Sequence, residues 1–275
     1  MRKAYKFRLY PNKTTEQKLF WVLTRCRELY NAALSERKDA YMYAGRSISW
    51  YEQKRDLSEI KHEIRTEYQD IGSHVLQDVL HRLNKAFDHF FRKVERKRAG
   101  HFVGNPGYPR FQQRNRYTSF TYPDGAGWKL TVEERGEKFA GTLHLAKIGK
   151  AKVKLHRQPQ GQIKTVTIKR EVDQWYVIFS CQVAEPEKLP ASYEDIGIDL
   201  GVTHLATLSN GEMIEHPHYY RKAQKILKKR QQSVSRKKRD SHRRAKAGKL
   251  VGKAHRKIAR QRRDFNHKVS RELGR

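Results

Sequence analysis

The sequence is poor in cysteine and has no long apolar run. It contains only 2 cysteines, Cys26 and Cys181, and they lie far apart in the chain. This excludes a disulfide scaffold and a cysteine-based zinc ribbon within these 275 residues, so no zinc site is expected. No apolar segment is long enough to span a bilayer, and the basic start of the chain has no apolar signal core. We therefore expect an intracellular protein that does not enter a membrane.

Acidic residues are also scarce, which leaves a large excess of positive charge. The chain has 60 Lys and Arg against 29 Asp and Glu, a formal net charge of +31. Self-repulsion at this charge destabilises the folded state unless a polyanion is bound. DNA or RNA is the simplest such partner. A membrane surface fits less well, because the basic helices lack a broad apolar face.

Helical periodicity dominates residues 12–99, which we expect to form a small helical domain. The spacing of Thr14 and Gln17 suggests a capping box for the first helix, and Gly45 ends it. A second helix is predicted over 50–67, with Leu57, Ile60 and Ile64 pointing inward. A third begins at Gly72-Ser73 and carries the clearest apolar stripe of the chain.

Residues 100–190 contain short β-type runs between turns, which predicts an all-β, barrel-like module. The runs are 117–122, 128–132, 142–145, 151–155, 163–169 and 175–183, and the last two are expected to form a hairpin. Tyr5, Phe7 and Leu9 alternate with basic residues and predict a further strand at the N-terminus. If that strand joins the module, the helical domain is an insertion between its strands.

A third region begins near residue 193. Residues 196–201 have the pattern of a buried strand that ends in Asp199 and Gly201. Residues 205–208 and 213–214, joined by Ser209-Asn210-Gly211, predict an adjacent hairpin. Two helices are then expected over about 218–245 and 250–273, with a break near Gly248 and Gly252.

The two expected C-terminal helices carry most of the excess charge. Residues 221–275 include 23 Lys and Arg and 3 acids, which gives 23 − 3 = +20. A solvated charged surface would interleave Glu with Lys, so this composition favours contact with phosphates. Such contacts position a duplex without reading its sequence. The candidate nucleic-acid-binding residues here are Lys228, Lys229, Arg236, Lys237, Arg243, Arg244, Arg256, Arg260 and Arg263.

Asp199 is the candidate catalytic residue. An acid at the end of a central strand, followed by Leu-Gly and an antiparallel hairpin, occurs in RNase H-like nucleases, where it holds Mg²⁺. A similar opening occurs in ATPases of the actin and chaperone type, and an Asp that caps a turn is the plainer alternative. No second glycine-rich phosphate loop follows Asp199, and a strongly basic region does. The nuclease-like interpretation is therefore favoured.

Several segments, in the same order along the chain, resemble the TnpB (OrfB) family of bacterial insertion sequences, relatives of the type V CRISPR effectors. The resemblance extends over nearly the whole chain. Residues 5–11 resemble the family's first strand, and 196–201 with 203–206 resemble its first RuvC motif. The remaining matching segments are 27–31, 107–111 and 262–270.

The resemblance implies a multidomain α+β fold. Residues 1–11 and 100–190 would form a wedge-type β-barrel, 12–99 an inserted helical recognition lobe, and 193–275 the N-terminal part of a RuvC (RNase H-like) domain with a basic helical hairpin. It also implies Mg²⁺-dependent cleavage of double-stranded DNA guided by an RNA from the transposon end, next to a short flanking motif. Such a protein would act in the cytoplasm of a bacterium or archaeon, associated with the nucleoid.

The resemblance also suggests binding residues. In the recognition lobe, Tyr51, Ser73 and Gln77 are candidates for the flanking motif, although solvent-facing polar residues would look the same. Arg110, with Tyr108 and Phe111, could contact guide RNA, or Pro109 could simply hold a structural turn. His204 could lie near a metal, but a surface histidine is the plainer interpretation.

The family's nuclease uses three acids, of which Asp199 would be the first. The second and third, and the zinc ribbon, follow the segment that 262–270 resembles and are not in this sequence. One carboxylate holds Mg²⁺ poorly. We therefore expect this chain alone to cleave DNA inefficiently. The alternatives are a general RNA- or DNA-binding protein without guided recognition and, less favoured, an ATPase.

Overall fold

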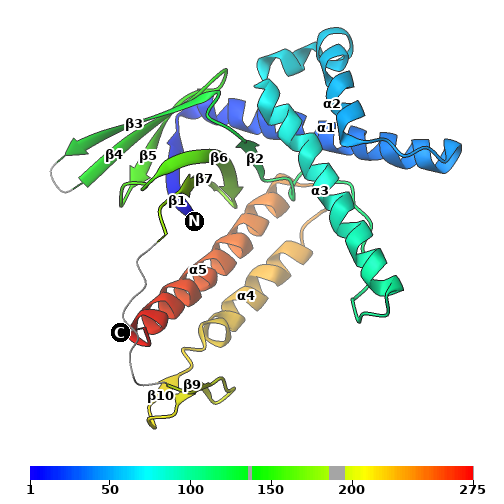
Figure 1. The fold of residues 1–275 in the computed structure, drawn as a ribbon. Coiled ribbons are helices and arrows are strands. Elements are labelled where there is room, and N and C mark those ends of the chain that lie inside the picture. Colours follow the sequence, from blue (N-terminus) through cyan, green and yellow to red (C-terminus); the bar gives the residue numbers. More distant parts are fainter. Residues whose placement is uncertain (136–137, 186–195, 275) are drawn as a thin grey trace. The chain divides into compact units, whose positions relative to one another are not determined.

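The chain forms two compact units, residues 1–185 and 186–275. The structure is a computed structural model, and it describes residues 1–135, 138–185 and 196–274 (Figure 1). The first unit combines a curled sheet with three helices, and the second combines a small sheet with a helical hairpin.

The sheet of the first unit has seven antiparallel strands in the order β2-β6-β7-β1-β5-β4-β3. The strands are β1 (Arg2–Pro11), β2 (Ser119–Tyr122), β3 (Trp128–Arg135), β4 (Lys138–Leu145), β5 (Gly149–Leu155), β6 (Gln162–Glu171) and β7 (Gln174–Gln182). Each β-type run predicted from the sequence is a strand, and β6 and β7 form the predicted hairpin. Strand β1 lies between β7 and β5, so the helices are inserted between strands of one sheet.

Alternation along the strands places apolar side chains on one face of the sheet. Tyr5, Phe7 and Leu9 are each only 1% exposed, as their spacing predicted. The sheet curls around this face, as the ribbon shows (Figure 1). Among the described residues no ladder joins β2 to β3, so the predicted barrel is an open, curled sheet.

The helices between β1 and β2 are α1 (Lys13–Ala44), α2 (Trp50–Glu59) and α3 (Ser73–Arg98). Gly45 ends α1 in the left-handed conformation, at φ 61°, as expected for a C-terminal glycine. The predicted capping box was wrong: Asn12 caps α1, and its side chain accepts a hydrogen bond from the Thr15 amide at 2.7 Å. Asn12 stands where the strand ends, so it can adopt the extended backbone that a cap needs.

The predicted second helix is interrupted. After α2 the chain forms a π-helical turn (Ile60–Ile64) and a 3₁₀ helix (Thr66–Asp70), separated by Arg65 in a non-helical conformation. The wider π turn rotates the side chains that follow it, and Ile64 is 67% exposed rather than inward. The Arg65 guanidinium bonds Glu28 at 2.9 Å and Glu67 at 2.7 Å, which holds the chain in this bend.

Sheet and helices share one hydrophobic core. Side chains from α1 and α3 pack directly against the inner face of the sheet. Polar contacts reinforce this packing: Trp175 Nε1 donates to Glu16 at 3.0 Å, and Arg82 donates to the Ser119 carbonyl oxygen at 2.8 Å. The helical region and the sheet therefore form one compact unit. The division of this unit into a β-barrel domain and a helical recognition lobe stays a prediction.

The second unit contains a three-stranded sheet, in the order β10-β9-β8, and two helices. Its elements are β8 (Ile198–Asp199), β9 (His204–Leu208), β10 (Met213–Glu215), α4 (Tyr219–Ser235) and α5 (His242–Glu272). The β9–β10 hairpin is as predicted. The predicted position of the helix break was wrong: the break spans residues 236–241, and Gly248 and Gly252 lie inside α5. Ser241 caps α5 through the Arg244 amide at 3.1 Å and so sets where the helix begins, and a glycine inside a helix costs only about 1 kcal/mol.

The strand that ends in Asp199 is exposed, in contrast to the buried strand predicted. It pairs over two residues with β9, and no described strand pairs with its other edge. Ile198 is 50% exposed and Leu200 is 77% exposed. The apolar run of 196–201 is real, but no described element covers it. No helix among the described residues is long and apolar enough to cross a membrane.

Candidate nucleic-acid interface

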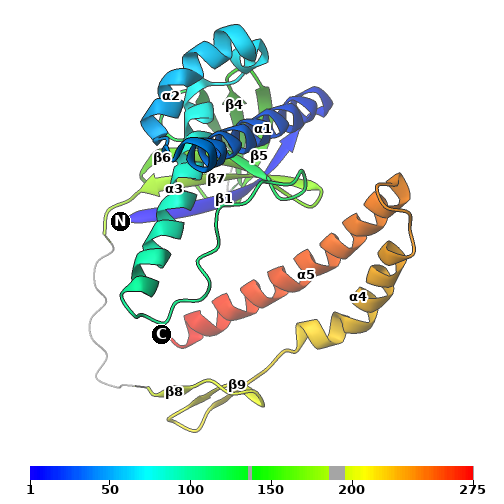
Figure 2. The same ribbon diagram turned by 90° about the vertical axis from the view of Figure 1, so that its right-hand side faces the viewer.

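Helices α4 and α5 form an antiparallel hairpin (Figure 2). Its inner side is apolar and its outer sides are basic. Leu227, Ala247 and Ile258 are buried between the helices, and Tyr219 packs edge-on against Phe265 at a centroid distance of 6.2 Å. Six of the nine predicted phosphate-contacting residues are exposed: Lys228, Lys229, Arg236, Arg243, Arg260 and Arg263. The apolar seam therefore fixes two helices whose cations face outward.

Two of the predicted binding residues also hold the turn between the helices. Arg244 Nη1 donates to the carbonyl oxygens of Val234 at 3.1 Å and Lys237 at 3.0 Å. Lys237 Nζ donates to the Ser233 carbonyl oxygen at 2.9 Å. Both side chains are partly buried, as is Arg256. Arg244 and Lys237 therefore stabilise the ends of the helices, a role that the charge pattern did not reveal.

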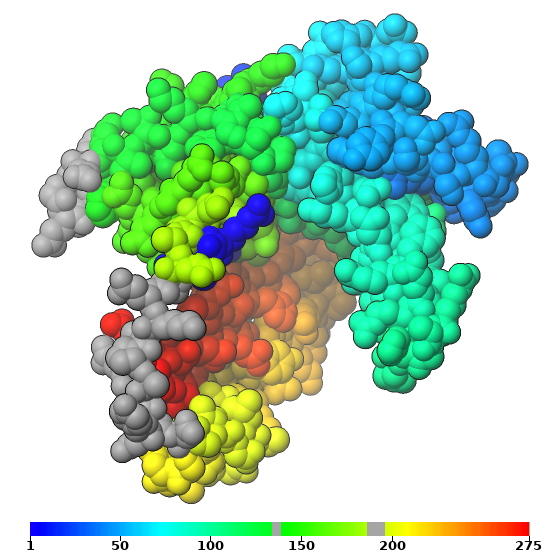
Figure 3. Space-filling view, viewed as in Figure 1, coloured from blue at the N-terminus to red at the C-terminus, as the bar shows by residue number. Residues whose placement is uncertain are grey.

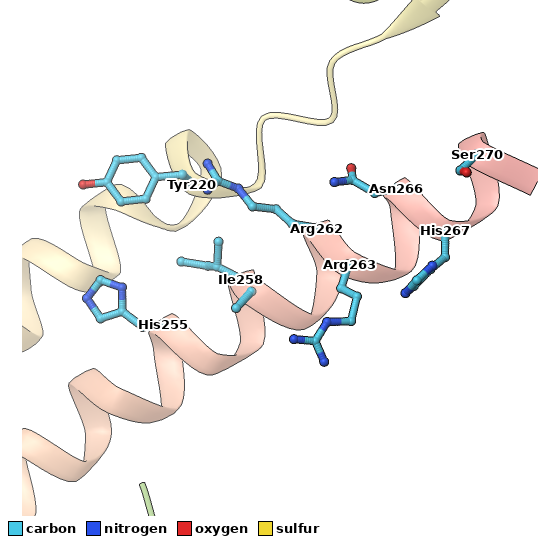
Figure 4. Close-up of a pocket in the computed structure, with 9 residues that line it drawn as sticks. Tyr220, His255, Ile258, Arg262, Arg263, Asn266, His267 and Ser270 are labelled. Atoms are coloured by element: carbon cyan, nitrogen blue, oxygen red, sulfur yellow. The ribbon is translucent and has the colours of Figure 1, made fainter. Parts of the chain in front are cut away.

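A groove of about 880 Å³ runs along α5 where it faces the start of α4 (Figure 4). Arg262 and Asn266 point to the Tyr220 side of α5, and Arg263 and His267 point to the other. The other residues that line it are His255, Ile258, Ala259 and Ser270, and no carboxylate is among them. Cationic and amide donors without a competing acid suit phosphate oxygens.

One of the acids on the hairpin forms a local ion pair. Asp264 accepts an ion pair from Lys268 at 3.0 Å, one helical turn away, and this hydrogen bond raises the pKa of Lys268. At the start of α4, desolvation and the charge of nearby His216 lower the pKa of His218. The hairpin therefore keeps its positive charge at neutral pH mainly through Lys and Arg.

Asp199 lies on the exposed edge strand, opposite Thr207 of β9. The described residues contain no group of three or more His, Cys, Asp or Glu side chains that could hold a metal ion. His204, the other candidate, bonds Glu215 through Nδ1 at 3.0 Å. Asp199 supplies one carboxylate, whereas a hydrolytic metal site needs several ligands. The described residues therefore do not fit a complete Mg²⁺ site.

The three recognition-lobe candidates lie on two antiparallel helices. Trp50 of α2 contacts His81 of α3 at a centroid distance of 5.4 Å, and Lys61 donates to Ser73 Oγ at 3.0 Å. The start of α2 therefore lies beside the third turn of α3. Tyr51, which is 75% exposed, is at the level of His81, while Gln77 lies about one turn and Ser73 about two turns nearer the start of α3. The three residues are not adjacent.

The 107–111 segment is held by helix α3. Tyr108 packs edge-on against Phe87 at 5.5 Å and Phe90 at 5.3 Å. Burial raises the pKa of Tyr108. Arg110 and Phe111 are exposed. Tyr108 is thus partly structural, whereas Arg110 is available to a ligand.

Sequence reasoning missed a basic surface on the outer face of the large sheet. Lys150, Lys152 and Lys154 are exposed along β5, and Arg8 of β1 stands directly opposite Lys154. Tyr10 stands opposite Lys152. Like charges at paired positions destabilise a sheet unless a counter-ion is present. The alternation of lysine with apolar residues over 150–155 was the available signal, but only the register places Arg8 beside it.

Together with the basic hairpin, these surfaces give the chain a charge distribution that complements a polyanion. Two family descriptions match the chain: "Probable transposase" (OrfB_IS605) over residues 178–275 and "Helix-turn-helix domain" (HTH_OrfB_IS605) over residues 1–46. The chain belongs to the TnpB (OrfB) family of insertion-sequence proteins.

Two relatives carry informative names. "Putative RNA-guided DNA endonuclease InsQ" of Escherichia coli (strain K12) is 29% identical over 235 residues, which cover 85% of this chain and 54% of InsQ. A "Putative RNA-guided DNA endonuclease" of Streptomyces pristinaespiralis is 31% identical over 287 residues, which cover 100% of this chain and 65% of that protein. The chain thus spans between half and two thirds of these relatives.

Two solved structures are also similar. The "Cas12f1-sgRNA-target DNA complex" matches 99% of this chain and 69% of that chain at 14% identity, with a TM-score of 0.38. The "CRISPR-Cas12f Ternary Complex" matches 94% of this chain and 60% of that chain at 13% identity, with a TM-score of 0.41.

Proposed function

We propose that this chain is an RNA-guided DNA-binding protein of the TnpB type. The observation that carries the proposal is the α4–α5 hairpin, whose apolar seam fixes two helices with exposed cations. Such a surface holds the sugar-phosphate backbone of a nucleic acid. Membership of the TnpB family, and the names of the two relatives, support a guide RNA and a DNA target as the partners. Base pairing with the guide would then read the target sequence.

Within this proposal, each part of the fold has a role. The curled sheet is the wedge-type domain, helices α1 to α3 form the recognition lobe, and the second unit belongs to a RuvC domain. Tyr51, Ser73 and Gln77 contact the short motif beside the target, and Arg110 contacts guide RNA. The protein works in the cytoplasm, close to the nucleoid.

Asp199 is the proposed catalytic and metal-binding acid. Its place after β8, in a segment that resembles the first RuvC motif, supports this role. If Mg²⁺ binds at Asp199, it would supply a Lewis acid for phosphodiester hydrolysis. The described residues provide one suitable carboxylate at this place. The proposed function of this chain is therefore DNA binding, and cleavage is tested separately from binding.

The test is to purify the chain at moderate salt, extract the nucleic acid that it retains, and sequence it. One dominant RNA species, followed by binding of duplex DNA that depends on this RNA, is the expected result. A heterogeneous mixture would instead favour a general binding protein, the second candidate. That candidate is supported by the fact that phosphate contacts of the hairpin carry no sequence information.

Asp199→Asn provides a matched control for the role of the carboxylate. The variant should retain the same RNA and the same affinity for target DNA, because Asp199 is exposed and lies outside the basic hairpin. Any Mg²⁺-dependent cleavage by the purified chain should disappear in the variant. Cleavage that persists in Asp199→Asn would show that Asp199 does not carry it.

A further inference from the structure

The outer half of helix α3 carries a cluster of aromatic rings at the surface. Phe87, Phe90, Phe91 and Tyr108 form this α3 aromatic cluster. Phe91 lies 5.2 Å from Phe90, and Tyr108 lies 5.3 Å from Phe90, both edge-on. The inner ring, Phe87, is 8% exposed, whereas Phe91 is 54% and Tyr108 is 43% exposed. The space-filling view shows this part of α3 standing clear of α1 and α2 (Figure 3).

Exposed rings that are held in place mark a binding surface. An apolar cluster in water costs free energy, and soluble proteins rarely expose one without a function. Here the inner ring packs against α1, where the buried Arg37 guanidinium lies 5.2 Å from the Phe87 centroid. The packed inner ring therefore holds Phe91 and Tyr108 in place. Stacking of a ligand on these two rings costs little further loss of side-chain entropy in the protein.

The charge beside the cluster identifies the chemistry of the ligand. The last turns of α3 carry five cations, Arg92, Lys93, Arg96, Lys97 and Arg98, against one acid, Glu95. Among the described residues, none of these five cations pairs with a carboxylate. Aromatic rings interleaved with unpaired cations complement a chain of bases and phosphates. A purely apolar protein partner would leave this charge unmatched.

The rings also distinguish an unpaired strand from a duplex. In a duplex each base face is covered by the next base pair, so a side chain on the protein surface cannot stack on it. We propose that the α3 aromatic cluster binds an unpaired nucleic-acid strand, with bases stacked on Phe91 and Tyr108 and phosphates on the cations of residues 92–98. This inference rests on the proposed function and adds a site for bases to the phosphate-binding hairpin.

The test uses the full chain and photo-crosslinking, because the hairpin also binds oligonucleotides. The probes are 5-bromouracil-substituted RNA and DNA oligomers of about 12 nucleotides, and an abasic oligomer of the same length serves as the charge control. The base-containing probes should crosslink within residues 87–111. Phe91→Leu keeps an apolar side chain but removes the ring, and it should abolish that crosslink.

Affinity gives the second readout. Phe91→Leu should weaken binding of the base-containing oligomers at this site by about 5- to 100-fold and leave the abasic oligomer unaffected. Phe91→Trp should restore binding. Tyr43→Leu is the matched control, since Tyr43 is an 81% exposed ring at the end of α1, and it should change nothing. Similar binding of RNA and DNA, or a preference for either one, fits the proposal.

Three results would overturn the inference. Crosslinks confined to α4 and α5, with Phe91→Leu like the wild type, would leave the proposed function intact and remove this site. Failure of the wild type to bind any nucleic acid would remove both. A concentration-dependent dimer that Phe91→Leu abolishes in sedimentation, without a crosslink, would assign the cluster to a second copy of the chain.

Discussion

The side chain of Asn31 and the main chain of Gln112 bind each other through two hydrogen bonds. Asn31 Nδ2 donates to the Gln112 carbonyl oxygen at 3.1 Å, and the Gln112 amide donates to Asn31 Oδ1 at 2.7 Å. The pair joins helix α1 to the chain that follows α3. As a result, the 27–31 and 107–111 segments, both of which resemble the TnpB family, are neighbours in the fold.

Asn31→Asp should therefore destabilise the first unit. The carboxylate keeps the acceptor for the Gln112 amide but loses the donor and places a negative charge near a carbonyl oxygen. We expect a loss of about 1–3 kcal/mol in the free energy of unfolding, measured with urea. Asn115→Asp, in the exposed turn that follows, should change it by less than about 0.5 kcal/mol. Equal losses in the two variants would contradict a structural role for the pair.

Arg37 is a buried cation that joins the three helices. It is 8% exposed, and it donates to Gln53 Oε1 at 2.8 Å and to Asn84 Oδ1 at 3.3 Å. Its removal leaves the buried Gln53 oxygen and the partly buried Asn84 oxygen without this donor, so Arg37→Met should cost about 3 kcal/mol of stability despite the apolar replacement. Thermal and urea unfolding test this, with the exposed neighbour Lys38→Met as control. A neutral Arg37→Met would show that the polar junction is dispensable.

Glu52 predicts a local pH dependence at the start of α2. It accepts hydrogen bonds from the Ser49 amide at 2.8 Å and Arg46 at 2.8 Å, and these lower its pKa from 4.5 to about 2. Because the folded-state pKa lies below the unfolded one, this stabilisation is present above about pH 4.5 and is lost as the pH falls towards 2. Amide exchange at Ser49 and Glu52 should accelerate relative to the intrinsic exchange rate over that range.

Glu52→Gln removes the titrating group, so exchange at Ser49 should then no longer change between pH 4.5 and 2 beyond the intrinsic rate. Glu59→Gln, at the other end of α2, should keep the wild-type behaviour. A wild-type profile in Glu52→Gln would assign the pH dependence to another group.

The α4–α5 hairpin predicts a salt-dependent affinity. Each phosphate contact contributes a slope of about −0.9 to the dependence of log K on log salt concentration. Replacing Lys228, Lys229 and Arg243 with Gln should flatten the slope by about 3 and weaken binding to all sequences alike. Filter binding at several salt concentrations measures this, and an unchanged slope would rule out the hairpin as the phosphate-binding surface.

Arg244→Gln should behave differently from these three variants. Arg244 donates to two carbonyl oxygens at the turn, so its loss should lower the stability of the hairpin by about 1–3 kcal/mol. The salt slope measured below the unfolding transition should stay close to that of the wild type. A slope reduced by about 1 would mean that Arg244 also contacts a phosphate.

Much of this protein follows from local pattern. Alternation predicted the strands of the large sheet, and helical spacing predicted α1 and α3, because burial of one face is a property of neighbouring residues. The charge count predicted nucleic-acid binding for a similar reason, since net charge does not depend on the fold. The candidate residues Tyr51, Ser73 and Gln77 stay predictions, and the structure places them at different levels of two helices.

Tertiary structure decided which side chains meet. The cross-strand pair of Arg8 and Lys154, the hydrogen bonds of Asn31 with Gln112, and the edge-on contact of Phe90 with Tyr108 all join residues from separate parts of the chain. Register and packing set such pairs, and sequence spacing does not record them. The exposure of Asp199 has the same origin. Its apolar neighbours predicted a buried strand, but burial requires a covering element, and only the fold shows whether one is present.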